Sequence, residues 1–97
     1  MLGGTPVRPH DDDLRMVPGI LYRNTDIEET GVSCGVMGHP ANGIAWLANK
    51  LHALGFPPLE PGQMLLAGSY VRPIWAQVGD TIRADFGALG SLSIRFA

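Results

Sequence analysis

A loop carrying glycine, serine and arginine gives the clearest chemical signal in this sequence. Gly68 and Ser69 follow a short apolar run, and Arg72 comes three residues later. Backbone N–H groups and a hydroxyl at the end of a strand are a common place for an anionic ligand. An arginine can bind a carboxylate through two parallel hydrogen bonds. The loop therefore predicts an anion site, although a surface arginine is an equally good interpretation of Arg72.

The histidines and the single cysteine carry weaker signals. His39 precedes Pro40 at an expected helix start, where it could act as a general base, but capping a free backbone N–H is the favoured role. His10 and His52 have no acidic or cysteine neighbours at metal-ligand spacing and are interpreted as surface groups. Cys34 has no basic neighbour that would favour its thiolate, so we expect a buried structural role.

The acidic residues do not predict a metal site within this chain. Asp11, Asp12 and Asp13 have no partner at ligand spacing, so we expect a solvated loop there rather than a cation site. Glu28 and Glu29 are adjacent on an expected strand and should point to opposite faces of it. Neither a complete catalytic set nor a set of metal ligands is predicted.

Composition bounds the class of protein. The 97 residues are enough for one small domain, with 45% apolar and only 16% charged residues. A net charge of −2 gives no basic excess for nucleic acid, and there is no apolar run of 18 or more residues for a membrane span. A single cysteine cannot form an internal disulfide, which favours a reducing compartment and a cytoplasmic location.

The elements that must position these groups are one helix and several short strands. Pro40 and Gly55 bound an expected helix over residues 40–54, and its apolar stripe consists of Ile44, Leu47, Leu51 and Leu54. The expected strands are residues 20–23, 27–32, 64–67, 81–86 and 91–96.

These elements predict an α+β fold of mostly short antiparallel or mixed strands with one main helix. Residues 1–18 are expected to be an irregular lead-in, and residues 19–97 to hold the strands and the helix of a single domain. The apolar run 64–67 is expected to be a strand buried on both faces, and Trp46 and Trp75 to serve packing. One helix can cover only one face of the sheet, so the other face requires a partner from outside this chain.

Four stretches resemble the 2-oxo-acid hydratase and decarboxylase family, which has the fumarylacetoacetate hydrolase fold. They lie within residues 21–32, 38–51, 66–73 and 79–96, and the most specific is HPANGIAWLANKL in the expected helix. The resemblance runs from about residue 7 to the end of the chain. It implies a C-terminal fragment of a single hydratase domain.

The resemblance also implies a Mg²⁺ or Mn²⁺ ion held by three carboxylates, a Glu-x-Glu pair and one later Glu, with a lysine that helps to move protons. This sequence has no Glu-x-Glu, and its only lysine, Lys50, lies in the helix motif. The metal-bearing half is therefore expected to precede Leu2, and no metal is expected to bind this chain alone.

The implied reaction is addition of water to a 2-oxo or 2-hydroxy dienoic diacid of aromatic catabolism, namely 2-oxohept-4-ene-1,7-dioate. Gly68 and Ser69 match the loop that borders the substrate in this family, and we assign Arg72 to the distal carboxylate. Two alternatives stay open: a non-catalytic remnant or pairing module, and decarboxylation of 2-oxo-3-hexenedioate. The expected partners are the small-molecule 2-oxo acid and further copies of the chain in a homo-oligomer, without nucleic acid or membrane.

Overall fold

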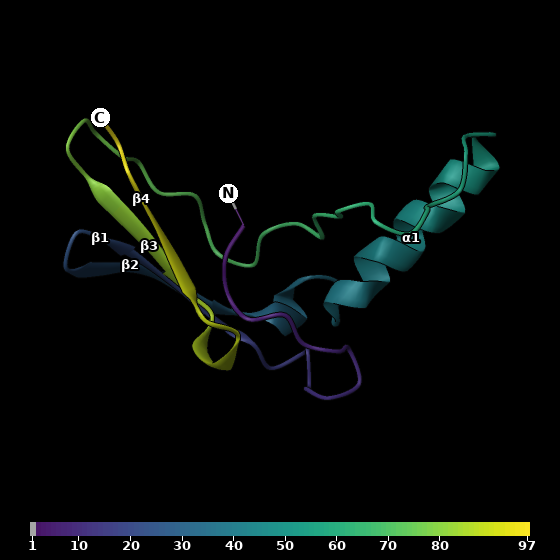
Figure 1. The fold of residues 1–97 in the computed structure, drawn as a ribbon, viewed down its shortest axis with the longest axis horizontal. Helices are drawn as coiled ribbons and strands as arrows, with labels where there is room; N and C mark the ends of the chain where they lie inside the picture. The colour runs from purple at the N-terminus through teal and green to yellow at the C-terminus, as the bar shows by residue number, and fades with distance from the viewer. Residues whose placement is uncertain (1) are drawn as a thin grey trace.

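The computed structural model describes residues 2–97 and contains four antiparallel strands, one α-helix and long irregular segments (Figure 1). The strands are β1 (Pro18–Arg23), β2 (Asp26–Val32), β3 (Thr81–Asp85) and β4 (Ser91–Arg95), and they form one sheet in the order β2-β1-β3-β4. Two 3-10 turns, Ser33–Gly35 and Gly87–Leu89, follow β2 and β3. The two predicted hairpins are therefore joined edge to edge into a single sheet.

Asn24 links the two hairpins. It has φ 59° in the turn between β1 and β2, a backbone region that asparagine tolerates better than most residues. Its side-chain amide donates to the Asp80 carboxylate at 2.9 Å, and its side-chain oxygen accepts from the Thr81 N–H at 3.0 Å. These bonds hold the turn of the first hairpin against the start of β3.

The two faces of the sheet differ in character. Leu21 pairs with Ala84, and Ala84 pairs with Leu92, so these apolar side chains share one face, which we call the cavity face. On the opposite face, Tyr22 pairs with Arg83, whose guanidinium carbon lies 4.3 Å from the centre of the tyrosine ring. The predicted alternation of β3 and β4 is therefore confirmed.

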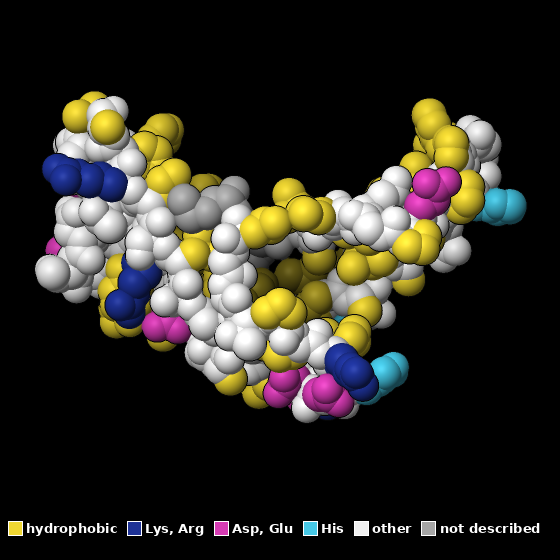
Figure 2. Space-filling view, in the orientation of Figure 1, with side chains coloured by type: hydrophobic (Ala, Val, Ile, Leu, Met, Phe, Trp, Pro, Cys, Tyr) yellow, Lys and Arg dark blue, Asp and Glu magenta, His cyan; other side chains and the backbone are white. Residues whose placement is uncertain are grey.

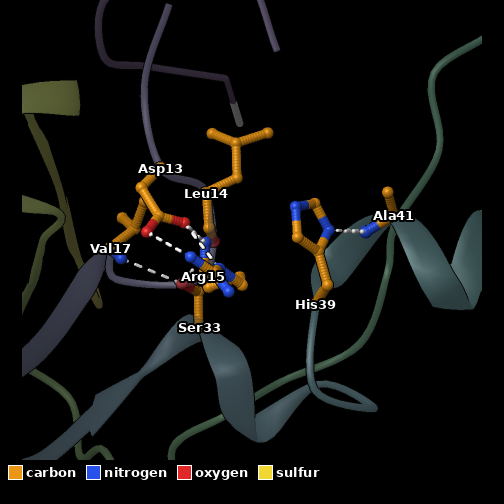
Figure 3. Close-up of polar contacts among 7 residues, drawn as sticks. All are labelled: Asp13, Leu14, Arg15, Val17, Ser33, His39 and Ala41. Atoms are coloured by element: carbon orange, nitrogen blue, oxygen red, sulfur yellow. Dashed lines mark hydrogen bonds and ion pairs between the residues drawn. The ribbon is translucent and has the colours of Figure 1, made fainter. Parts of the chain in front are cut away.

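The helix α1 (Pro40–Ala53) begins and ends where the sequence predicts, to within one residue. His39 caps it, because its Nδ1 accepts from the Ala41 N–H at 3.0 Å (Figure 3). Gly55 follows the helix with φ 74°, the left-handed region that glycine adopts without steric cost.

The helix does not cover the sheet, and this expectation was wrong. None of its residues is buried, and Figure 1 shows α1 extending away from the four strands. Trp46, near the middle of the helix, is 56% exposed, and Trp75 is 88% exposed, so neither provides the expected packing. Local sequence determines the helix ends, but the apolar stripe has no sheet to pack on within residues 2–97.

The predicted strand over residues 64–67 is also wrong. The segment is irregular, with Met64 75% and Leu66 97% exposed. None of the four described strands pairs with it, so its backbone has no ladder to join. An apolar run indicates burial only where other polypeptide is present to cover it.

Ser33 fastens the lead-in to the end of β2. It is 2% exposed, and its hydroxyl donates to the Leu14 carbonyl at 2.5 Å and accepts from the Val17 N–H at 2.9 Å (Figure 3). Ser33 takes the inner position of the turn, so the neighbouring Cys34 points outward and is exposed. The expected buried role of Cys34 is therefore wrong.

The chain as a whole is open. Its solvent-accessible surface is 7425 Å², against about 5,400 Å² for a compact protein of 10.4 kDa. Its radius of gyration is 15.3 Å, against about 12.5 Å for a compact domain of this length. Figure 2 shows apolar side chains on the surface of both the sheet and the helix. Within residues 2–97, no helix has the length and apolar character of a membrane crossing.

Candidate functional site

A cavity of about 430 Å³ lies between the cavity face of the sheet and the loop of residues 68–73. The sheet contributes Gly19, Ile20 and Leu21 from β1, with Ala84 and Phe86 from β3 and its end. The loop contributes all six of its residues. The site therefore joins β1 to a loop about 50 residues later in the sequence, and the loop meets the sheet at Gly19 and Gly31.

The three residues predicted to bind an anion all line this cavity. Gly68 has φ 108°, a conformation that other residues rarely adopt, so the loop depends on glycine at this position. Arg72 is exposed and, among the described residues, has no carboxylate within ion-pair distance. No aspartate or glutamate lines the cavity. Arg72 is thus the one formally charged group on the cavity wall formed by the described residues.

Ser69 is engaged within its own loop. Its hydroxyl donates to the Val71 carbonyl at 2.8 Å and accepts from the Val71 N–H at 3.3 Å. A serine hydroxyl carries a single proton, so in this arrangement it cannot also donate to a bound anion. Ser69 closes a tight turn over residues 69–71, and Arg72 provides the positive charge of the site.

Tyr70 anchors the loop, a role that was not predicted from the sequence. A Cβ atom built on Gly19 would lie 2.5 Å from Cε2 of the Tyr70 ring, and one built on Gly31 would collide with the Tyr70 carbonyl oxygen. Gly19 and Gly31 are directly paired between β1 and β2. The Tyr70 hydroxyl donates to the Pro18 carbonyl at 3.4 Å, and burial raises the pKa of this phenol.

A sequence signal for this contact did exist. Glycine inside a strand often marks a close approach by another segment. Gly31 lies within the predicted strand 27–32, and Gly19 immediately precedes the predicted strand 20–23. What the sequence could not provide was the identity of the approaching segment.

The other predicted groups lie apart from the cavity. His39 caps α1, and Cys34 is not among the lining residues. Asp13 forms a two-pronged ion pair with Arg15, with N–O distances of 2.9 Å, and these hydrogen bonds lower the Asp13 pKa to about 2 (Figure 3). Glu28 pairs with the Arg23 guanidinium at 2.6 Å.

The described residues offer no ligand set for a divalent ion. Within residues 2–97, no three histidine, cysteine, aspartate or glutamate side chains come together as metal ligands. Lys50 is exposed on α1 and is not a cavity residue. The residues present therefore do not fit the metal that the resemblance implies, and the cavity combines apolar walls with the guanidinium of Arg72.

Comparison with known proteins connects this site to a group of enzymes. No protein-family model matches the chain. It is 53% identical over 96 residues to the 2-oxo-hept-4-ene-1,7-dioate hydratase of Escherichia coli, covering 99% of this chain and 36% of that protein. It is 31% identical over 96 residues to the 2-keto-4-pentenoate hydratase of Paraburkholderia xenovorans strain LB400, covering 99% of this chain and 35% of that protein.

A solved structure supports the same relationship. The fold superimposes on 4-oxalocrotonate decarboxylase from Pseudomonas putida G7, complexed with magnesium and adipate, with a TM-score of 0.91 and 30% sequence identity. The superposition covers 98% of this chain and 36% of that protein, so this chain spans about a third of the length of the relatives that it matches. By sequence and by fold, the chain matches the C-terminal part of hydratases and decarboxylases of 2-oxo acids.

Proposed function

We propose that this chain forms one wall of the substrate pocket in a hydratase that adds water to a 2-oxo dienoic diacid, with 2-oxohept-4-ene-1,7-dioate as the substrate. One observation carries the proposal. Gly68, Ser69 and Arg72 meet on an apolar cavity without acidic lining residues, in a chain 53% identical to a hydratase of that diacid. The chain would be the C-terminal fragment of a single hydratase domain with the fumarylacetoacetate hydrolase fold.

Arg72 gives the wall its selectivity for a second carboxylate. Its guanidinium is unpaired among the described residues, so it can bind a substrate carboxylate without first breaking an ion pair. Leu21, Ala84 and Phe86 provide an apolar surface for the hydrocarbon part of the substrate. A monoacid of the same class would meet the apolar surface but leave the arginine without its partner.

Acid–base and metal chemistry would come from other polypeptide. The related decarboxylase was solved with magnesium and adipate, which supports a divalent ion beside a diacid in this group of enzymes. The described residues contain no such ion site, and the cavity has no acidic side chain that could move a proton. We therefore assign substrate binding to this chain and expect no metal to bind it alone.

Decarboxylation is the second candidate. The close superposition on 4-oxalocrotonate decarboxylase supports it, since about a third of that protein has the same fold as this chain. The identity of 53% to the hydratase, against 30% to the decarboxylase, favours hydration. Release of carbon dioxide from 2-oxo-3-hexenedioate, without hydration of the seven-carbon diacid, would support the decarboxylase.

A chimera tests the proposal with this chain's own residues. Residues 2–97 replace the matched 96 residues of the Escherichia coli hydratase, and hydration is followed as loss of dienol absorbance. We expect turnover of the seven-carbon diacid. An inactive but folded chimera that binds Mg²⁺ would instead support the non-catalytic remnant.

Arg72→Ala in the active chimera tests the role of the arginine. A hydrogen bond to a charged group contributes about 1.5–3 kcal/mol, so the KM for the diacid should rise by about 10- to 100-fold. The KM for the monoacid 2-hydroxypenta-2,4-dienoate should change much less. Arg95→Ala is the matched control, because Arg95 is exposed and does not line the cavity. An unchanged KM for the diacid would remove Arg72 from the site.

A further inference from the structure

The substrate-binding loop is attached to the sheet by one side chain at its centre. The Tyr70 ring lies so close to Gly19 that a Cβ atom there would be 2.5 Å from Cε2 and 3.1 Å from the hydroxyl oxygen. Real Cβ contacts are essentially never shorter than 3.0 Å. The ring therefore occupies the space that a side chain on β1 would otherwise fill.

The loop backbone approaches the sheet as closely as the ring does. A Cβ atom on Gly31 would collide with the Tyr70 carbonyl oxygen and lie 3.1 Å from Cγ1 of Val71. A Cβ atom on Gly35 would lie 3.3 Å from the Tyr70 Cβ. Gly19 and Gly31 face each other across the β1–β2 ladder. Two positions without side chains on adjacent strands therefore accommodate Tyr70, and we call them its seat. The aromatic ring on Gly19 also shields the strand backbone that this glycine leaves exposed.

Tyr70 lies between two other residues that line the cavity. Ser69 precedes it, and Arg72 follows two residues later. The two hydrogen bonds between Ser69 and Val71 hold residues 69–71 as one tight turn. Because these bonds hold the turn together, a displacement of Tyr70 should also move the backbone of Arg72, which follows the turn.

We infer that Tyr70 is a positioning residue, which holds the Arg72 guanidinium at the cavity by packing its ring on Gly19 and its backbone on Gly31. The inference rests on the proposed function, because it concerns how the same site recognises the second carboxylate. Tyr70 acts through Arg72 and does not donate to the substrate, since its hydroxyl is directed to the Pro18 carbonyl. The ring, rather than the hydroxyl, is the working part, because that hydrogen bond is long at 3.4 Å.

A positioning role and a purely structural role predict different kinetics. If the ring only stabilises the fold, its loss lowers the amount of active enzyme and affects diacid and monoacid substrates alike. If the ring positions Arg72, its loss raises the KM for the diacid and leaves kcat and the monoacid KM nearly unchanged. Tyr70→Phe keeps the ring and should retain the diacid KM.

The kinetic test uses the active chimera with Tyr70→Ala and Tyr70→Phe. We expect Tyr70→Ala to raise the diacid KM by about tenfold, with kcat changed less than about twofold, and Tyr70→Phe to restore the KM. Adding Arg72→Ala to Tyr70→Ala should cause little further loss, because both changes remove the same contact. Equal losses on diacid and monoacid, or additive losses in the double variant, would overturn the inference.

A second measurement needs no turnover and keeps the inference separate from the proposed function. In the 97-residue chain itself, Gly19→Ala should shift the amide NMR signals of Ser69 and Arg72, because its Cβ displaces the ring. In a Tyr70→Ala background the same substitution should leave those signals in place. If Gly19→Ala shifts these signals only when Tyr70 is present, and the chimera is inactive, the proposed function alone is refuted. We call this dependence on Tyr70 the coupling. Absence of the coupling would refute the seating of Tyr70, whatever the chimera does.

Discussion

The sheet and the helix obtain their order in different ways. The four strands and the loop over residues 68–73 hold one another through paired backbones, the Asn24–Asp80 link and the seat of Tyr70 on glycine. The helix α1 has both caps in place, yet none of its residues is buried. Caps specify where a helix begins and ends, whereas tertiary packing provides most of its stability.

This difference teaches where the functional information of the chain lies. The sheet region pairs its strands with one another and presents a cavity, although apolar strand side chains such as Ile27 and Ile94 stay exposed. The helix region carries an apolar stripe and an exposed Trp46 that only additional polypeptide could cover. The family resemblance was strongest in the helix motif, but the geometry that supports a substrate site is in the sheet and its loop.

The largest effect is expected from adding a side chain at the loop seat. Gly31→Ala would drive a Cβ atom into the backbone of Tyr70, and backbone cannot move aside as a flexible side chain can. Overpacking of this kind costs about 1–3 kcal/mol, and we expect the upper end in the free energy of unfolding measured with urea.

Gly43→Ala is the matched control on the helix. A Cβ atom there would lie 3.4 Å from the Ala67 carbonyl oxygen, an ordinary contact, and alanine favours a helix by up to about 1 kcal/mol over glycine. Equal destabilisation by the two substitutions would remove the distinction between the regions.

Removing the Ser33 hydroxyl should have the next largest effect. Ser33→Ala leaves the Leu14 carbonyl and the Val17 N–H without their buried partner, at a cost of about 1–3 kcal/mol. Hydrogen exchange should then show faster exchange of the Val17 amide. Cys34→Ala, at the exposed neighbouring position, should change stability by less than about 0.5 kcal/mol. Unchanged protection of Val17 in Ser33→Ala would contradict the role given to Ser33.

A smaller effect is expected at the start of the helix. His39→Ala removes the acceptor for the Ala41 N–H, and loss of such a cap costs about 1 kcal/mol. Helical circular dichroism should fall, and His39→Asn, which keeps a side-chain acceptor, should retain most of it. The sheet should not respond to either substitution, so loss of sheet signals in His39→Ala would show that the two regions are coupled.

The smallest effect concerns an exposed ion pair. Hydrogen bonds from Arg15 lower the Asp13 pKa to about 2, below its unfolded value near 3.8. A lowered pKa means that the contribution of Asp13 is fully present above the unfolded value and is lost as the pH falls through about 2. NMR titration of the carboxyl carbon should give this pKa, and Arg15→Ala should return it toward the ordinary range. An ordinary pKa in the unaltered chain would show that the pair does not persist in water.

The sequence predicted the elements better than their arrangement. Alternation in 81–86 and 91–96, and the caps at His39 and Gly55, are local features, and each prediction was confirmed. The strand over residues 64–67 and the burial of Cys34 were wrong, because both depend on which segments lie opposite.

The candidate site shows the same division. Gly68, Ser69 and Arg72 were selected by residue type, and the structure gathers them at one cavity. Gly19 and Gly31 indicated a close approach to the strands, but the sequence could not show that Tyr70 makes it, because Tyr70 lies about 40 to 50 residues away along the chain. Their function as a substrate site stays a prediction.

Titration of the 97-residue chain with adipate, followed by NMR, tests most directly whether the sheet region alone presents a diacid site. The account predicts amide shifts confined to residues 68–72, to Gly19–Leu21 and to Phe86, with none in α1, and their loss in Arg72→Ala. Shifts that spread through α1, or that persist unchanged in Arg72→Ala, would contradict it.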